Sequence, residues 1–267
     1  MTVEYISARL IHGLSSDTKP TSVPANSIFY ETDLGAFYRY DGTYWFELAY
    51  HARPDDKKYG SYFGHGTTQA DGILNGRLAQ TVVGTGTSSA GIDANGTFRT
   101  LDTGATINSI SGYNLSGDIC RRDLNCYFKT KFDTGASIAN TRIFAGFTDT
   151  AAAPASAADP LNALQGVGLW YDSAVNANWR RFHNDNTGAG VSEDTTLAVA
   201  TSTIYTVEIF AVGASNKFVF NFNGTYTDIT TDIPAATTGL AMWVYIENTT
   251  GASRTIALRY IIMRNDK

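Results

Sequence analysis

The chain has 267 residues, of which 43% are hydrophobic and 17% charged, with two cysteines and six prolines. This composition can fill one large or two modest cores, so it excludes disorder, collagen-like repetition and a disulfide-stapled miniprotein. Twenty basic and twenty-five acidic residues give a net charge of -5. Nucleic-acid binding would need clustered Lys and Arg, and a membrane span would need roughly 20 consecutive apolar residues. Neither pattern is present, so we expect no nucleic-acid partner and no membrane insertion.

The first predicted elements are three short aromatic-rich strands within residues 27–48. Asp41 and Gly42 supply the two-residue turn of one hairpin, and residues 33–35 fit a bulged hairpin. Three strands bury little surface, so such a module needs a partner surface or neighbouring subunits. We predict a small N-terminal β-meander module over residues 1–65. Its aromatic residues are candidates for attachment to a partner: Phe29, Tyr30, Tyr38, Tyr40 and Trp45.

A glycine-dense region follows the meander. Residues 60–117 hold twelve of the 25 glycines, including those of the run Gly-Thr-Gly-Thr-Ser-Ser-Ala-Gly at 84–91. Such a composition is typical of an extended connector rather than of a core element. We therefore predict a glycine-rich connector over residues 66–100.

Residues 101–267 alternate in twos, as expected of strands with one buried face. The predicted buried rows are Phe218, Phe220 and Phe222; Met242, Val244 and Ile246; and Ile256, Leu258, Tyr260 and Ile262. About eight strands of this kind predict an all-β fold with a C-terminal antiparallel β-sandwich, jelly-roll or concanavalin-like. One short helix is expected at residues 159–164. The predicted core residues are Phe128, Phe132, Ile143, Phe147, Val207, Ile209, Phe220, Val244, Ile256 and Leu258.

The sequence Asp-Thr-Gly-Ala occurs twice, beginning at Asp102 and Asp133. It is similar to the active-site motif of aspartic proteases, in which two carboxylates share one proton. The two copies lie only 31 residues apart, too close for one copy in each lobe of a two-lobed enzyme. We expect each to be a turn in which the Asp accepts backbone amides and the Gly takes a positive φ. The chain is therefore predicted not to be an enzyme, with aspartic protease as a remote alternative.

Cys120 and Cys126 bracket five residues between two predicted strands. A hairpin could bring them within disulfide range, whereas assembly inside a cell favours a reduced pair, and both states stay open. No nearby His or Cys completes a zinc site. The acidic loops at 183–188 and 193–194 lack calcium-loop spacing and are expected to be exposed and polar. No metal and no cofactor is expected.

Three aromatic residues invite a carbohydrate hypothesis, because flat aromatic faces stack on sugar rings. Trp170, Tyr171 and Trp179 are the candidates for ligand contact. A tryptophan on a sandwich strand more often fills the core, so core packing is the favoured interpretation.

Two stretches resemble structural proteins of tailed bacteriophages. Residues 10–20, 27–33 and 38–45 resemble an N-terminal module common in phage fibres, head spikes and minor virion components. From about residue 127 the chain resembles the sandwich domain of phage surface proteins. The segments that carry this second similarity are 142–149, 166–170, 178–179, 183–185, 205–209 and 254–263. The resemblance implies a virion protein assembled in the host cytoplasm, with major capsid or tail proteins as partners and no catalytic residues to transfer.

Two functions remain open. The first is a structural protein displayed on the particle, of the capsid decoration or fibre type, that stabilises or adorns the virion. The second is a receptor-binding tail-fibre module that recognises a host surface glycan or protein. In either case a homotrimer is expected, since three copies around an axis would bury the aromatic surface of the meander.

Overall fold

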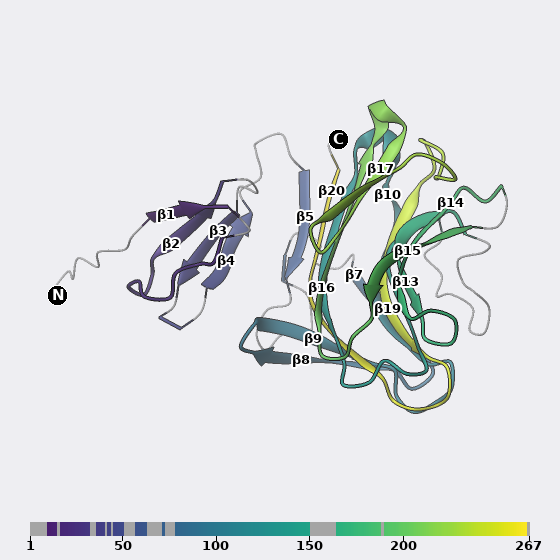
Figure 1. Cartoon of the computed structure of the whole chain (residues 1–267), viewed down its shortest axis with the longest axis horizontal. Helices are drawn as coiled ribbons and strands as arrows, with labels where there is room; N and C mark the ends of the chain where they lie inside the picture. Colours follow the sequence, from purple (N-terminus) through teal and green to yellow (C-terminus); the bar gives the residue numbers. More distant parts are fainter. Residues whose placement is uncertain are drawn as a thin grey trace. The chain divides into compact units, whose positions relative to one another are not determined.

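The computed structural model describes residues 10–14, 17–32, 36–40, 42–43, 45–50, 57–62, 71–72, 78–149, 164–187 and 190–265. The chain divides into two compact units (Figure 1). One comprises Met1–Asp55 and Asp93–Gly96, and the other comprises Asp56–Ile92 and Thr97–Lys267. The described residues contain many strands and two short 3₁₀ turns, and none of their helices is long and apolar enough to cross a membrane.

The first unit contains one four-stranded sheet. Its strands, in sheet order, are β1 (Leu10–Gly13), β2 (Ile28–Glu31), β3 (Ala36–Tyr40) and β4 (Trp45–Tyr50). Strands β2 to β4 form the predicted antiparallel meander. Strand β1 was not predicted, and it pairs with β2 in the parallel direction.

The two faces of this sheet carry different aromatic residues. Phe29 lies opposite Tyr38, and Tyr40 lies opposite Trp45, so these four side chains share one face. That face is covered by the preceding loop: the Trp45 indole donates to the Pro20 carbonyl at 2.9 Å and the Tyr40 hydroxyl donates to the Thr21 carbonyl at 2.9 Å. The Lys19 ammonium lies 4.1 Å from the Tyr38 ring centroid.

Tyr30 lies on the other face, where its ring stacks on Phe37 at 4.6 Å. The five predicted attachment aromatics are therefore divided between the two faces of the sheet. Phe29 and Tyr40 are buried and serve the module's own packing.

The second unit contains two antiparallel sheets. The seven-stranded sheet has, in order, β15 (Val191–Ala198), β14 (Asn178–Asn184), β13 (Gly166–Asp172), β12 (Thr141–Thr148), β19 (Leu240–Asn248), β10 (Ile110–Cys120) and β7 (Leu78–Val83). The other has β18 (Thr225–Ile229), β17 (Lys217–Phe222), β16 (Ile204–Val212), β11 (Tyr127–Thr134), β20 (Thr255–Asn265), β5 (Lys57–Tyr62) and β6 (Asp71–Gly72). Strand β9 (Gly96–Asp102) also pairs with β20, and β8 (Thr87–Asp93) pairs with β9.

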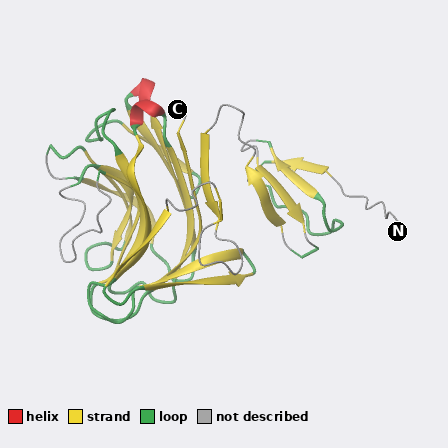
Figure 2. Cartoon of the chain, turned by 180° about the vertical axis from the view of Figure 1, so that it is seen from behind, coloured by secondary structure: helices red, strands yellow, loops and turns green. Residues whose placement is uncertain are grey.

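The two large sheets pack face to face, and Figure 2 shows them as two layers of strands. This sandwich confirms the all-β, jelly-roll or concanavalin-like prediction. Strands β7 and β8 and most of β9 lie within residues 66–100, where the glycine content predicted an extended connector. These segments form strands despite their glycine content, because β7 pairs with β10 and β9 pairs with β20. The helix predicted at 159–164 lies outside the described residues.

All ten predicted core residues are buried, each with 1% or less of its surface exposed, and all belong to one apolar cluster between the sheets. The rows on β17 and β19 are also confirmed. The predicted row on β20 is correct only as far as Leu258, because the core then takes Ile261 and Met263. Lys131 lies opposite Tyr260 while Phe132 lies opposite Leu258, so Arg259 is an extra residue in a β-bulge. The bulge shifts the alternation by one position.

Candidate functional site

A cavity of about 470 Å³ lies at the edge of the sandwich, between the outer strands of the two sheets. Strands β14 and β15 form one wall, and β17, β18 and the turn between them form the other. The lining residues are Arg181, Asp194, Thr195, Thr196, Leu197, Phe220, Phe222, Asn223, Thr225 and Thr227. Phe220 and Phe222 are buried members of the core cluster, so the cavity meets the apolar interior there.

A β-bulge in the edge strand β15 shapes one wall of the cavity. Asn178 pairs with Ala198 and Arg180 pairs with Asp194, so three residues of β15 lie opposite Trp179 alone. The middle residue of the three, Thr196, has φ of 62°. A β-branched residue rarely takes this left-handed conformation, and the surrounding contacts must hold it there.

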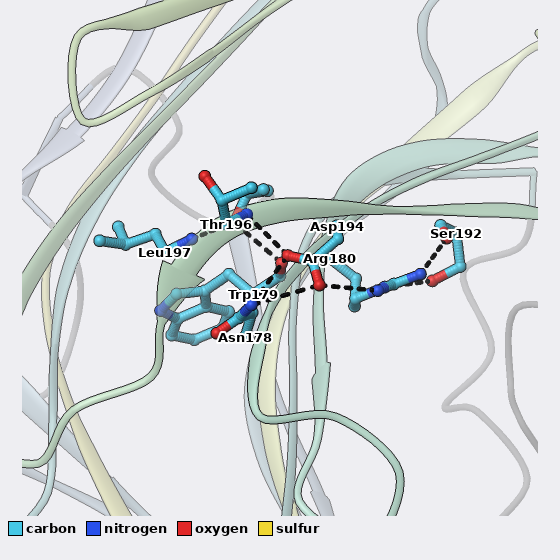
Figure 3. Close-up of polar contacts among 8 residues, drawn as sticks. Asn178, Trp179, Arg180, Ser192, Asp194, Thr196 and Leu197 are labelled. Atoms are coloured by element: carbon cyan, nitrogen blue, oxygen red, sulfur yellow. Dashed lines mark hydrogen bonds and ion pairs between the residues drawn. The ribbon is translucent and has the colours of Figure 1, made fainter.

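Asp194 holds the bulge in place (Figure 3). Its carboxylate accepts the Thr196 amide at 2.6 Å, the Asn178 side-chain amide at 3.1 Å and the Arg180 guanidinium at 3.2 Å. The Thr195 hydroxyl donates to the Trp179 carbonyl at 2.8 Å. The Thr196 amide, followed by the Asn178 amide, lowers the pKa of Asp194. Asp194 is therefore ionised at neutral pH, and its carboxylate lies with the side chains of Asn178 and Arg180, on the face of β14 away from Arg181.

The cation that lines the cavity already has an anionic partner. Arg181 Nε donates to the Glu193 carboxylate at 2.7 Å, and its guanidinium lies 6.0 Å from the Phe220 ring centroid. The charge of Arg181 is thus paired within the protein.

Neutral polar groups fill the remainder of the lining. Thr196, Asn223 and Thr225 are exposed, and Thr227 is partly exposed. The Asn223 side-chain oxygen accepts the Thr206 backbone amide at 2.8 Å, which leaves the Asn223 NH₂ group to donate elsewhere. The cavity combines apolar side chains with hydroxyl and amide groups and a paired guanidinium, a composition suited to a small polar ligand.

The three aromatic residues predicted for ligand contact do not line this cavity. Trp179 is fully buried and packs edge-to-face on Phe132 and Tyr205, and Tyr171 is 5% exposed in the same cluster. Trp170 is 4% exposed and points to the other face of the seven-stranded sheet. In this structure none of the three presents a ring face to solvent, so the ligand-contact hypothesis is wrong for them and core packing is correct.

Trp170 belongs to a second buried cluster, formed by Ile110, Phe144, Trp170, Phe182, Trp243 and Tyr245. Beside this cluster, Arg142 bonds Asp172 at 2.7 Å and lies 3.6 Å from Glu247. Burial raises the pKa of Glu247, and Arg142 opposes that shift. Buried acids with raised pKa values occur in active sites, but the Glu247 side chain is only 1% exposed. Its burial favours a structural role.

The first Asp-Thr-Gly copy is a turn, as predicted. The Asp102 carboxylate accepts the Gly104 amide at 2.7 Å, and Gly104 has φ of 67°. The Ser253 hydroxyl also donates to Asp102 at 2.6 Å. Asp102 therefore closes the end of β9 against the segment before β20.

The second copy differs from the prediction. Asp133 accepts Arg259 Nε at 2.8 Å instead of local backbone amides, and Gly135 is not in the left-handed region. Gly135 is needed for space, because a Cβ there would lie 2.4 Å from the Thr255 carbonyl oxygen. Strand β20 runs between Asp102 and Asp133, since β9 and β11 pair with its two sides. Two carboxylates separated by a strand, each with its own partner, do not form a protease dyad.

Cys120 and Cys126 are joined by a disulfide with a Cα–Cα distance of 5.4 Å, and both are fully buried. The sequence left both redox states open and favoured the reduced one, whereas the structure has the oxidised one. The bridge closes the loop that contains the 3₁₀ turn η1 (Arg122–Leu124). Within the described residues, no group of three His, Cys, Asp or Glu side chains is placed to hold a metal ion.

Comparison with known proteins shows the fold alone. No family model and no curated protein matches the chain. Among solved structures it is similar to a protein of unknown function, SO2946, from Shewanella oneidensis MR-1, with TM-score 0.56 and 14% identity over 79% of this chain and 86% of that one. It is also similar to the Emp46p carbohydrate recognition domain, with TM-score 0.54 and 6% identity over 77% and 95%.

A third similar structure is a carbohydrate esterase of the Shiga toxin-encoding bacteriophage phi24B. The TM-score is 0.50, with 16% identity over 79% of this chain and 97% of that chain. These neighbours, a carbohydrate recognition domain and a phage esterase among them, share the sandwich fold of this chain.

The cavity was missed at the sequence level, and residues 193–194, which were expected in an exposed polar loop, lie in strand β15. Strand β15 reads Val-Ser-Glu-Asp-Thr-Thr-Leu-Ala, a run that lacks the apolar alternation used to find the other strands. The sequence feature that could have indicated the cavity is its polar residue types, namely Asp194 followed by two threonines, and Asn223-Gly224-Thr225 at a turn.

Proposed function

We propose that the chain is a non-catalytic carbohydrate-binding protein displayed on the surface of a bacteriophage virion, with the glycan bound in the cavity between β15 and β18. The observation that carries this proposal is the cavity, which places hydroxyl and amide groups beside apolar side chains at the open edge of the sandwich. The carbohydrate recognition domain and the phage esterase among the similar folds support the class of ligand and the source.

Glycan binding is tested with the full chain on an array of defined oligosaccharides. Thr225→Trp places a large side chain in the cavity from the exposed edge of β18, and it should abolish glycan binding while leaving the melting temperature unchanged. Tyr226→Trp is the matched control: Tyr226 is the next residue on the same strand, is 61% exposed and does not line the cavity. Equal binding by both variants, or an array with no bound glycan, would contradict the proposal.

The N-terminal unit is proposed as the attachment module, on the sheet face that carries Tyr30 and Phe37. The opposite face is already covered by the loop at residues 19–21. A homotrimer anchored to capsid or tail proteins through this unit would leave the sandwich available to a host glycan.

The attachment test uses a truncation at the boundary between the units. Strand β5 (Lys57–Tyr62) pairs with β20 of the sandwich, so removal of residues 1–65 would damage the sandwich itself. Removal of residues 1–55 should leave the sandwich folded and prevent it from joining particles that lack the protein. Undiminished particle binding by the truncated chain would assign attachment to the sandwich instead.

A further inference from the structure

We propose that the cavity selects a neutral sugar and rejects acidic sugars such as uronic acids, an inference that rests on the proposed carbohydrate-binding function. The distribution of charge around the cavity supports this selection.

Recognition of a carboxylate by a protein normally uses a cation whose donors are available to the ligand. Arg181 is the one cation among the lining residues, and Glu193 occupies its Nε and an Nη group. Asp194 is the other charged residue of the lining, and its negative charge would repel a ligand carboxylate. An acidic sugar would therefore meet a negative charge and a guanidinium whose charge is already paired with that of Glu193.

The charged side chains next to the lining do not make the cavity more favourable for an anion. Arg180, on the strand next to β15, pairs with Asp194 at 3.2 Å. Together Arg180, Arg181, Glu193 and Asp194 carry two positive and two negative charges, which sum to zero. The whole chain has a net charge of -5, which also disfavours the approach of an anion.

The neutral polar groups of the lining fit the hydroxyls of a neutral sugar. The Asn223 NH₂ group can donate to a sugar oxygen, while Thr225 and Thr227 can donate or accept.

The apolar side of the cavity completes the match. Leu197 is 38% exposed, and the edges of Phe220 and Phe222 contribute to the lining. A pyranose ring has C–H groups as well as hydroxyls, so it can contact these side chains and the polar wall together. The volume of about 470 Å³ lies within the roughly 300–1,000 Å³ typical of small-molecule sites.

The test measures dissociation constants of the full chain for pairs of methyl glycosides that differ only at C6. Suitable pairs are glucoside with glucuronide, galactoside with galacturonide, and mannoside with mannuronide, at low and at physiological salt. At least one neutral glycoside should bind about tenfold or more tightly than its uronide, as expected when a ligand charge finds no available partner. A uronide that binds as tightly as its neutral partner would overturn the selection while the proposed function stands.

The decisive variant is Glu193→Gln, which removes the anion that occupies Arg181. Affinity for the uronide should rise about tenfold or more, while affinity for the neutral glycoside should change little. Asp228→Asn is the matched control, since it breaks a separate ion pair, with Lys217, outside the lining residues and should leave the preference unchanged. An unchanged preference in Glu193→Gln would overturn the role assigned to Arg181 and Glu193.

The two proposals can fail separately. If no glycoside of either charge binds the native chain, and no glycan on the array is retained, both the proposed carbohydrate binding and the selection of neutral sugars are contradicted. If glycans bind but the acidic members are preferred, only the inference falls.

Discussion

The interior of the sandwich and its open edge lie side by side, yet the two regions use their residues in different ways. In the interior, Trp179, Tyr205 and Phe222 interlock with ring centroids 5.0–6.0 Å apart, and each is at most 5% exposed. At the edge, the bulge of β15 carries hydroxyl and carboxylate groups that are partly or fully exposed. Interior substitutions should therefore change stability, whereas edge substitutions should change binding with little cost to the fold.

The largest effect is expected from the interior. Leu258→Ala removes a fully buried side chain from the main cluster and should lower the free energy of unfolding by about 2–5 kcal/mol. Chemical denaturation measures this loss, with Tyr226→Ala as the exposed control that should be near neutral. A near-zero change for Leu258→Ala together with Phe220→Ala would show that the interior is not the source of stability.

The next effect concerns an ion pair at the boundary of the interior. Asp133→Asn removes the charge opposite Arg259, whose side chain is 4% exposed, while the Asp133 side chain is 17% exposed. The unfolding free energy should fall by roughly 1–3 kcal/mol, because a mostly buried guanidinium loses its anion. This cost exceeds the loss expected if Asp133 were a turn residue. Stability unchanged by the substitution, measured by denaturation at neutral pH, would contradict the pairing.

A smaller loss is expected at the first copy of the same motif. Asp102→Asn keeps an oxygen that can accept the Gly104 amide and removes only the charge, so the cost should be about 0.5–1.5 kcal/mol or less. Comparing Asp102→Asn with Asp133→Asn in one denaturation series isolates the effect of position, since the local sequence is the same. Equal losses would mean that the two copies have the same role after all.

The interior could be predicted from the sequence because its signal is periodic. Rows such as Phe218, Phe220 and Phe222 follow from the alternation of side chains across a strand, and all ten predicted core residues are buried. The alternation was misread only after Leu258, since an inserted bulge residue leaves no mark in the sequence. Register is fixed by pairing with the neighbouring strand, which a single strand's sequence does not reveal.

The edge could not be predicted in the same way. Its residues come from four strands in two separate stretches of the chain, and the cavity exists only where the outer strands of the two sheets face each other. Local rules also assigned the same role to both Asp-Thr-Gly copies, although strand β20 supplies Arg259 to the second copy alone. Composition directed attention to Trp170 and Trp179, which the fold buries. Chemistry at the edge depends on tertiary contacts that local sequence does not contain.

The last effect on stability is expected at Thr196, and it has the opposite sign. Thr196 has φ of 62°, a conformation that costs a β-branched residue about 1–3 kcal/mol and costs glycine almost nothing. Glycine also gives the unfolded chain more freedom, which offsets the gain by about 0.4–1 kcal/mol. Thr196→Gly should therefore raise the unfolding free energy by about 1 kcal/mol.

The same variant should weaken glycan binding, because a hydroxyl that lines the cavity is lost. Thr196→Asn serves as its control, since asparagine tolerates this conformation and keeps a polar group. Denaturation and glycoside titration of the two variants measure the two quantities separately. If the Thr196→Gly protein is less stable than the native chain, the bulge is not strained. If it is more stable and binds the glycan less well, the strained backbone at Thr196 lowers stability while it places the groups that bind the ligand.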